Sequence, residues 1–409
     1  MSSPNLVNPF RPGAGHMPPY LAGRTAEQDE ARKALQQRIV MQNIIITGLR
    51  GVGKTVLLET IKPIAQEMGW LWVGADLSES TSVNEEKLAT RILADIARIT
   101  SALVAKEGKH LDFGFTGQER VIRQPLTYEI LVDYFQQTPG LISDKLKTSL
   151  EFVWSVLPHN AISGVVFAYD EAQNLADHSD RREYPLSVLL EVFQSIQRKN
   201  IPFLLVLTGL PTLFPKLVEA RTYAEGMFHV LFLKQLDEVS SREAIVTPTN
   251  RDDCPLKFSN EVVDRIIALS AGYPFFIQFI CKEVFDVWIT KIQCGEVPTV
   301  PENDIVRKLD TDFFYGRWAR VTDRQRQLLQ VVATLPGADD EFTVQEIVTA
   351  SKEMLSKGFT ASHVNQMFSS LANAGLVYRN RYGKYSLAVP LLAQFILRQT
   401  MEGSNLIPP

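Results

Sequence analysis

The sequence predicts an α/β fold followed by a small separate domain, and two observations support this class. First, short apolar runs alternate with longer segments whose apolar residues recur at helical spacing, as strands alternate with helices in α/β proteins. The five expected strands lie at residues 44–46, 70–77, 164–170, 202–211 and 228–233. Second, three helical segments and an alternating hairpin pattern close the chain, which indicates a separate domain.

Composition sets the outer limits of the interpretation. A chain of 409 residues is too long for one ordinary core, so two or three domains are expected. The formal net charge of −4 gives no general attraction to nucleic acid, so any such binding requires a local patch. The three cysteines lack metal-site spacing, the N-terminus lacks a signal-peptide pattern, and charges interrupt the longest apolar stretch. These features favour a cytoplasmic protein without a membrane partner.

The stretch 42–61 carries the strongest motif. Residues 48–55 read GLRGVGKT and match G-x-x-x-x-G-K-[ST] between an apolar run and a helical pattern. The glycines let backbone N–H groups turn towards phosphate oxygens, and the following helix N-terminus adds partial positive charge. Lys54 can reach the β- and γ-phosphates, while Thr55 can offer its hydroxyl to Mg²⁺. The predicted nucleotide-binding residues here are Gly48, Arg50, Gly51, Val52, Gly53, Lys54, Thr55 and Val56.

A second motif follows the expected strand 164–170. This apolar strand ends in Asp170 and is followed directly by Glu171. We interpret Asp170 as a Mg²⁺ ligand, directly or through water, and Glu171 as the residue that polarises the attacking water. An apolar strand before Asp-Glu is common on its own, but its pairing with a phosphate-binding loop favours a hydrolase.

Three further residues are candidates with two interpretations each. Thr208 ends the strand 202–211, where ligands of parallel sheets gather, so it is either a γ-phosphate sensor or a structural residue. Arg221 precedes the last strand and is either an arginine finger for a neighbouring subunit or an exposed arginine without that role. A homo-oligomer would follow from the first reading. Arg24, with Tyr20, either contacts the base or precedes a capped surface helix.

The C-terminal pattern of three helices and a hairpin predicts a winged helix. Residues 311–401 hold 10 Lys/Arg against 7 Asp/Glu, so this part is about +3 while the whole chain is negative. Arg379, Arg381 and Lys384 gather on the expected wing and are the candidate contacts to double-stranded DNA. The helix 360–373 has no Lys or Arg, so protein contacts alone are the alternative.

The chain resembles the AAA+-type ATPases of the archaeal-ATPase and initiator-like groups, adjacent to the signal-transduction ATPases called STAND. The resemblance covers residues 20–398 and rests on LAGR, GLRGVGKT, VVFAYDEAQ, LTGLP, SAGYPFFIQ and YSLAVPLLAQFI. It implies a five-stranded parallel core, a helical lid, and ATP as the nucleotide. Initiator-type members carry an arginine after the lid glycine, whereas this chain has Phe275 and Phe276. Tyr273 and Pro274 are therefore expected to pack on the adenine.

The expected organisation is an extended arm (1–20), a P-loop ATPase core (21–235), a helical lid with linker (236–310) and a winged helix (311–409). Two functions remain open. The first is an ATP-binding and hydrolysing switch whose nucleotide state controls assembly or loading on DNA. The second is a STAND-like regulatory ATPase that uses the winged helix to contact a protein partner.

Overall fold

The computed structural model describes residues 7–13, 15–37, 39–101, 126–157, 161–251, 254, 256–294, 299–380 and 383–404. The chain forms two compact units that interleave along the sequence. We call Thr25–Thr47 with Leu57–Phe232 the sheet unit. The lid unit comprises Met1–Arg24, Gly48–Val56 and Leu233–Pro409. The glycine-rich loop thus belongs to the lid unit, although the strand before it and most of the helix after it belong to the sheet unit.

The sheet unit is built on five strands in the order β2-β3-β4-β1-β5. Their bounds are β1 Asn43–Gly48, β2 Trp70–Asp76, β3 Gly164–Asp170, β4 Phe203–Gly209 and β5 Phe228–Leu233. β2, β3, β4 and β1 pair in parallel, with Tyr169 opposite Leu207 and Thr47 opposite Gly209. The carboxyl ends of β1, β3 and β4 therefore meet at one edge, which is the sheet edge where α/β proteins bind ligands. The predicted α/β class with a parallel sheet is confirmed.

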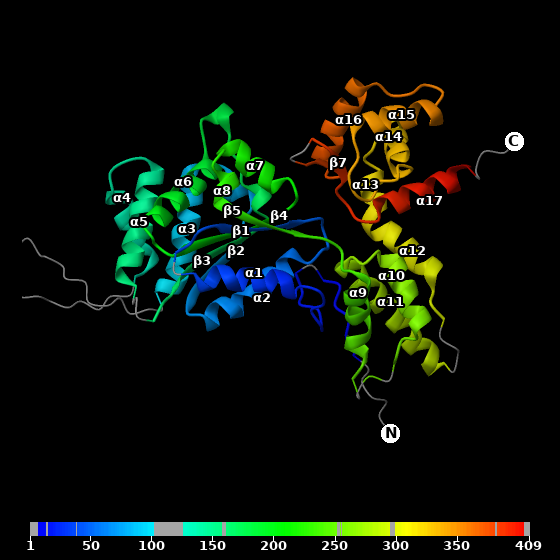
Figure 1. Ribbon diagram of the computed structural model, residues 1–409, viewed down its shortest axis with the longest axis horizontal. Helices are drawn as coiled ribbons and strands as arrows, with labels where there is room; N and C mark the ends of the chain where they lie inside the picture. The colour runs from blue at the N-terminus through cyan, green and yellow to red at the C-terminus, as the bar shows by residue number, and fades with distance from the viewer. Residues whose placement is uncertain are drawn as a thin grey trace, which may run out of the picture. The chain divides into compact units, whose positions relative to one another are not determined.

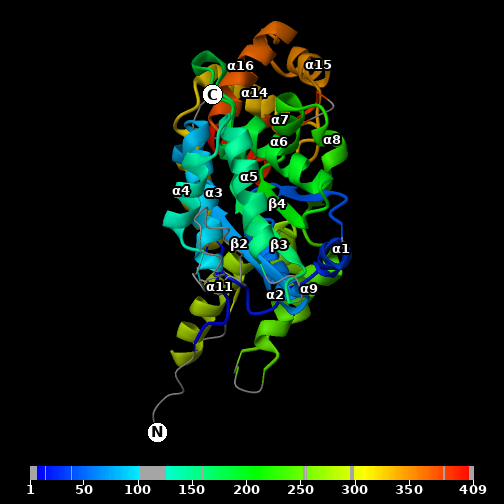
Figure 2. The same cartoon turned by 90° about the vertical axis from the view of Figure 1, so that its left-hand side faces the viewer.

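Helices cover both faces of this sheet (Figures 1 and 2). Their bounds are α1 Thr25–Gln36, α2 Lys54–Glu67, α3 Glu85–Thr100, α4 Tyr128–Gln137, α5 Ile142–Val156, α6 Pro185–Arg198, α7 Leu213–Ala220 and α8 Ala224–Met227. Ile45, Phe167 and Leu205 join one continuous core with α3 to α7. The strand residues that point the other way are also buried, with α1 and α2 on their side. Double-sided burial explains why these strands are apolar runs without alternation.

The lid unit contains the remaining helices. Their bounds are α9 Glu238–Val246, α10 Asn260–Ser270, α11 Pro274–Gln293, α12 Glu302–Leu309, the π-helical turn η5 Asp310–Tyr315, α13 Gly316–Trp318, α14 Asp323–Ala333, α15 Val344–Met354, α16 Ala361–Asn373 and α17 Leu392–Ser404. Short 3₁₀ turns occur at η1 Glu79–Ser82, η2 Ala172–Asn174, η3 Ser179–Arg181 and η4 Thr247–Thr249. None of the helices in these described ranges is long and apolar enough to cross a bilayer.

The elements of a winged helix are present near the C-terminus. Helices α14, α15 and α16 each begin after a threonine whose hydroxyl accepts a backbone N–H three residues later. Such N-caps satisfy donors that the first helical turn leaves unpaired, and they fix where each helix starts. The hairpin follows as β6 Val377–Arg379 and β7 Tyr385–Leu387, paired antiparallel. Phe342 adds a bridge to Tyr385, which ties the hairpin to the segment before α15.

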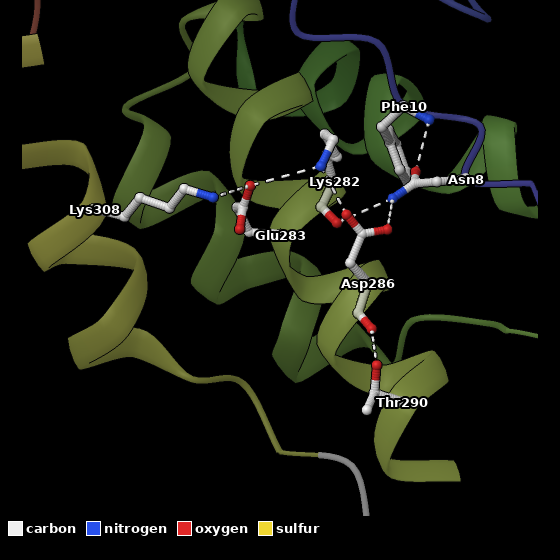
Figure 3. A network of polar contacts seen from close by, with 7 residues as sticks. All are labelled: Asn8, Phe10, Lys282, Glu283, Asp286, Thr290 and Lys308. Atoms are coloured by element: carbon white, nitrogen blue, oxygen red, sulfur yellow. Dashed lines mark hydrogen bonds and ion pairs between the residues drawn. The ribbon is translucent and has the colours of Figure 1, made fainter. Parts of the chain in front are cut away.

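The described residues 7–13 and 15–20 of the N-terminal arm form no helix or strand, and the arm packs against α11 (Figure 3). The Asn8 side-chain amide donates to the Lys282 carbonyl (3.0 Å) and to the Asp286 carboxylate (2.7 Å). Phe10 is buried, with its ring 6.1 Å from that of Phe258 and 6.4 Å from that of Phe285. The arm is therefore part of the aromatic core of the lid.

Candidate nucleotide-binding site

The glycine-rich loop connects β1 to α2 and has a backbone that side chains would obstruct. Gly51 and Gly53 adopt positive φ of 81° and 92°, a region that L-residues rarely occupy. A Cβ on Gly51 would also lie 3.0 Å from the Cβ of Phe275. The sequence reading of these glycines as conformational requirements agrees with these dihedral angles. Val52 is buried within the loop, whereas Arg50 is exposed on it.

The Lys54 ammonium turns back into the loop. It donates to the carbonyls of Gly48 and Leu49, each at 3.0 Å. Lys54 is also the first residue of α2, so the loop ends at a helix N-terminus, followed by Thr55 and Val56. A cation and a helix N-terminus at the end of a glycine-rich loop are features suited to phosphate.

Two other segments of the lid unit hold this loop in place. The buried Arg24 guanidinium donates to the carbonyls of Val52 (2.9 Å) and Lys234 (2.8 Å). The Phe275 amide at the start of α11 donates to the Gly51 carbonyl (3.1 Å). Arg24, which precedes the loop in the sequence, and Phe275, which follows it by more than 200 residues, thus both fix the loop backbone. For Arg24 this is a positioning role that the sequence had not suggested.

Tyr273 and Pro274 lie at the start of α11. Pro274 is the first residue of α11, and the Tyr273 ring is buried. Burial, with smaller contributions from the charges of Asp339 and Tyr378, raises the pKa of the Tyr273 hydroxyl to about 12. Both of these neighbours belong to the winged-helix region. Packing of Tyr273 and Pro274 on an adenine stays a prediction.

Within the sheet unit, the end of β3 carries a pre-oriented carboxylate. Asp170 is nearly buried, and its Oδ1 accepts from the Thr208 hydroxyl and from the Glu171 amide (2.7 Å). Thr208 is fully buried on β4, so the structure shows it orienting Asp170. Its function as a γ-phosphate sensor stays a prediction.

Glu171 occupies an unusual backbone position beside a residue that sequence reasoning overlooked. It adopts a left-handed conformation (φ 52°, ψ 35°), which costs free energy for a residue other than glycine. The Gln173 amide donates to the Glu171 carboxylate and accepts from the Leu210 amide (3.1 Å) at the end of β4. Gln173 therefore links the candidate catalytic carboxylate to the neighbouring strand end. Its place in the run DEAQ was visible in the sequence, but its partner was not.

Arg221 lies at the C-terminal end of α7 and is about two-fifths exposed. Its guanidinium lies 3.8 Å from the Glu191 carboxylate, at the long limit of an ion pair. An exposed and weakly paired arginine remains available for other contacts. The arginine-finger function stays a prediction.

The wing places its cations beside an acidic segment. Arg379 and Lys384 are exposed on the hairpin, and Arg381 lies outside the described residues. Lys384 pairs with Glu341 (3.4 Å), and the Asn380 side chain also donates to Glu341. Sequence reasoning missed Glu341, although the run Asp339–Glu341 was visible as a local excess of acid.

Comparison with known proteins identifies the fold. A family model described as "Domain of unknown function (DUF8462)" matches residues 311–396. A search of curated proteins found no match.

Among solved structures, the ORC2 protein of Aeropyrum pernix in its ADP form is similar over 97% of this chain and 98% of its own. Its sequence identity is 16% and its TM-score is 0.54. The ORC1 protein of the same organism in complex with DNA matches 95% of this chain and 96% of its own, at 16% identity and a TM-score of 0.44. The chain therefore shares the overall fold of this ORC2 structure, with a five-stranded sheet and a helical C-terminal region.

Proposed function

We propose that this protein is an ATP-binding and ATP-hydrolysing switch. The observation that carries the proposal is the loop 48–55, whose positive-φ glycines and inward-turned Lys54 ammonium form a cradle for phosphate. Arg24 and Phe275 hold the loop backbone through the carbonyls of Val52 and Gly51, and a loop fixed in this way would lose little conformational freedom on binding. The ADP form of the Aeropyrum pernix ORC2 structure supports a nucleotide as the ligand of this fold.

Several residues would act on the bound ATP. Lys54 would exchange its two carbonyl acceptors for phosphate oxygens. Thr55 and Asp170 have the oxygen donors that Mg²⁺ prefers, and the ion would neutralise charge on the phosphates. Thr208 and the Glu171 amide already aim the Asp170 carboxylate. Glu171 would orient and polarise the attacking water, and Gln173 would position Glu171.

The lid offers a route from the nucleotide to the winged helix. Phe275 bonds to the loop at Gly51, and Tyr273, two residues earlier, lies beside Asp339 and Tyr378. A displacement of the loop at Gly51 would move Phe275, and Tyr273 is only two residues away at the start of α11. Such a displacement would therefore also change the surroundings of Tyr273. We propose that the nucleotide state controls the winged helix, which would bind double-stranded DNA through Arg379, Arg381 and Lys384.

A specific observation favours a second candidate function. Glu341 pairs with Lys384, and helix α16 carries no lysine or arginine. Local acid reduces the electrostatic attraction that supplies most nonspecific DNA affinity. A STAND-like regulatory ATPase would use the same winged helix to bind a protein partner.

A comparison of Glu171→Gln with the wild type tests the proposed activity. Wild type is expected to bind ATP with Mg²⁺ and to hydrolyse it. The variant should bind ATP as tightly but hydrolyse it about 10²–10⁴-fold more slowly, because only water activation is lost. Glu225→Gln, an exposed glutamate on α8, is the matched control and should hydrolyse ATP at the wild-type rate. Failure of the wild type to bind any nucleotide would overturn the proposal.

A further inference from the structure

The turn after β3 holds the Glu171 carboxylate on a backbone that its surroundings must fix. Glu171 is left-handed, and the 3₁₀ turn η2 follows it directly. A residue other than glycine keeps such a conformation only where neighbouring contacts enforce it. The residues that attach this turn to the rest of the sheet unit therefore influence where the Glu171 carboxylate lies.

Gln173 makes the contacts between this turn and the end of β4. Its side-chain amide donates to the Glu171 carboxylate, and its side-chain oxygen accepts from the Leu210 amide (3.1 Å). The close approach depends on Gly209, because a Cβ there would lie 2.6 Å from Oε1 of Gln173. Gln173 thus joins Glu171 to β4 through a space that a side chain at position 209 would fill.

A lysine of α7 holds the backbone of the same glutamine. The Lys216 ammonium donates to the Gln173 carbonyl at 2.8 Å. Burial lowers the pKa of this ammonium, although the carboxylates of Asp177 and then Glu219 oppose that shift. A cation that has lost part of its water gains from a carbonyl acceptor, because burial without a hydrogen bond is costly. Lys216 therefore fixes Gln173 by a contact that the partly buried ammonium itself requires.

Helix α7 presents Lys216 from a fixed position. Leu213 and Leu217, on either side of Lys216 in the sequence, are fully buried in the core of the sheet unit. The Leu213 amide donates to the Leu210 carbonyl (2.8 Å), and the Leu210 amide bonds to Gln173. The segment 210–216 therefore holds Gln173 twice, through its side-chain oxygen and through its backbone carbonyl.

We propose that Lys216 is a positioning residue for ATP hydrolysis and acts on Glu171 through Gln173. This inference rests on the proposed function, which makes Glu171 the residue that polarises the attacking water. Lys216 contacts neither the nucleotide nor the water. It fixes the turn that carries Glu171, so its loss would slow the attack of water on the terminal phosphate. Binding of ATP, which depends on the loop 48–55, would not change.

The test separates the rate of hydrolysis from the affinity for ATP in the full chain. Wild type, Lys216→Met and Lys216→Arg are compared in kcat with Mg²⁺-ATP and in affinity for a non-hydrolysable ATP analogue. We expect Lys216→Met to lower kcat about tenfold, the lower end for a lost hydrogen bond with a charged partner. Its affinity for the analogue should change less than about twofold. Lys216→Arg should recover part of the rate, because a guanidinium also donates to a carbonyl.

A double variant distinguishes positioning of Glu171 from a general structural role. In single-turnover hydrolysis, Lys216→Met combined with Glu171→Gln should be no slower than Glu171→Gln alone. The carboxylate that Lys216 positions is already absent there, so the two losses should not add. A fall by the same factor in both backgrounds would overturn the inference.

The controls separate this inference from the proposed function. Lys147→Met removes a partly buried lysine of α5 that pairs with Asp144, and it should hydrolyse ATP at the wild-type rate. If Lys216→Met does not fold, Lys216→Gln keeps a polar group there on a shorter side chain and must show the loss of rate. An unchanged kcat beside an active wild type overturns the inference alone. A wild type that does not hydrolyse ATP overturns the proposed function.

Discussion

The glycine-rich loop and the wing both present exposed cations, but their neighbours differ. At the loop, the Lys54 ammonium donates to the carbonyls of Gly48 and Leu49. At the wing, Glu341 lies between Lys384 and Asn380. The wing therefore holds a cation that is already paired with an acid, although the two regions look alike in composition. An anion would meet an ammonium and a helix N-terminus at the loop, and a partly neutralised cation at the wing.

The largest expected effect comes from removing the loop cation. Lys54→Ala should weaken ATP binding about 100-fold, because a charge-assisted contact to phosphate is lost and alanine has no donor to replace it. Calorimetry with an ATP analogue measures the change. Lys87→Ala, an exposed lysine on α3, is the matched control. Equal ATP affinity of wild type and Lys54→Ala would show that the loop cation does not contribute to phosphate binding.

The second-largest loss of nucleotide affinity is expected from a change in the backbone conformation of the loop at Gly51. Gly51→Ala places a Cβ at φ 81° and within 3.0 Å of the Phe275 Cβ, so the loop must shift. Nucleotide affinity should fall about tenfold, since a left-handed conformation costs roughly 1–2 kcal/mol per L-residue. Gly226→Ala, where a Cβ meets nothing within 4 Å, is the control. A melting temperature measured in parallel separates loss of binding from loss of folding.

Neutralising the wing should have a smaller effect. Alanine at Arg379, Arg381 and Lys384 should reduce affinity for duplex DNA about equally for all sequences. The salt dependence should flatten by up to ~0.9 log units per lost phosphate contact. Because Lys384 is already paired, the total change should fall short of three full contacts. An unchanged salt slope would show that the wing does not touch DNA, and absence of DNA binding by the wild type would favour the protein-partner function.

The smallest expected effect tests the acidic neighbour directly. Glu341→Gln frees Lys384 and should raise DNA affinity by up to about fivefold, matching the worth of an exposed ion pair. Glu353→Gln, exposed on α15, should leave the affinity unchanged. A lowered affinity in Glu341→Gln would contradict the idea that this acid opposes DNA.

Local patterns predicted the elements of the fold well because their causes are local. The apolar runs at 44–46 and 164–170 became strands β1 and β3, and threonines marked the starts of α14 to α16. The contiguous motif 48–55 likewise predicted a loop between a strand and a helix. Each of these features depends on residues within a few positions of one another.

Contacts between residues far apart in the sequence could not be predicted from the sequence patterns. Arg24 was left between base contact and a surface cap, and its partners Val52 and Lys234 are 28 and 210 residues away. The charge of about +3 in residues 311–401 took no account of which acid faces which base. Periodicity and composition carry no information on such pairings, so the contacts of Gln173 and Glu341 became visible only in the structure.

The contact of the arm with α11 has a consequence for how the chain folds during synthesis. Asn8 bonds to Lys282, which is made 274 residues later, and Phe10 packs on Phe258 and Phe285. Every residue of the sheet unit, by contrast, has been made once Phe232 emerges. Because domains tend to fold as they leave the ribosome, the sheet unit can fold before the residues that the arm contacts have been synthesised. During that interval the apolar side chain of Phe10 is exposed, because the residues that bury it have not been synthesised. We expect chaperone binding and misassembly of the nascent chain to be most frequent at this stage.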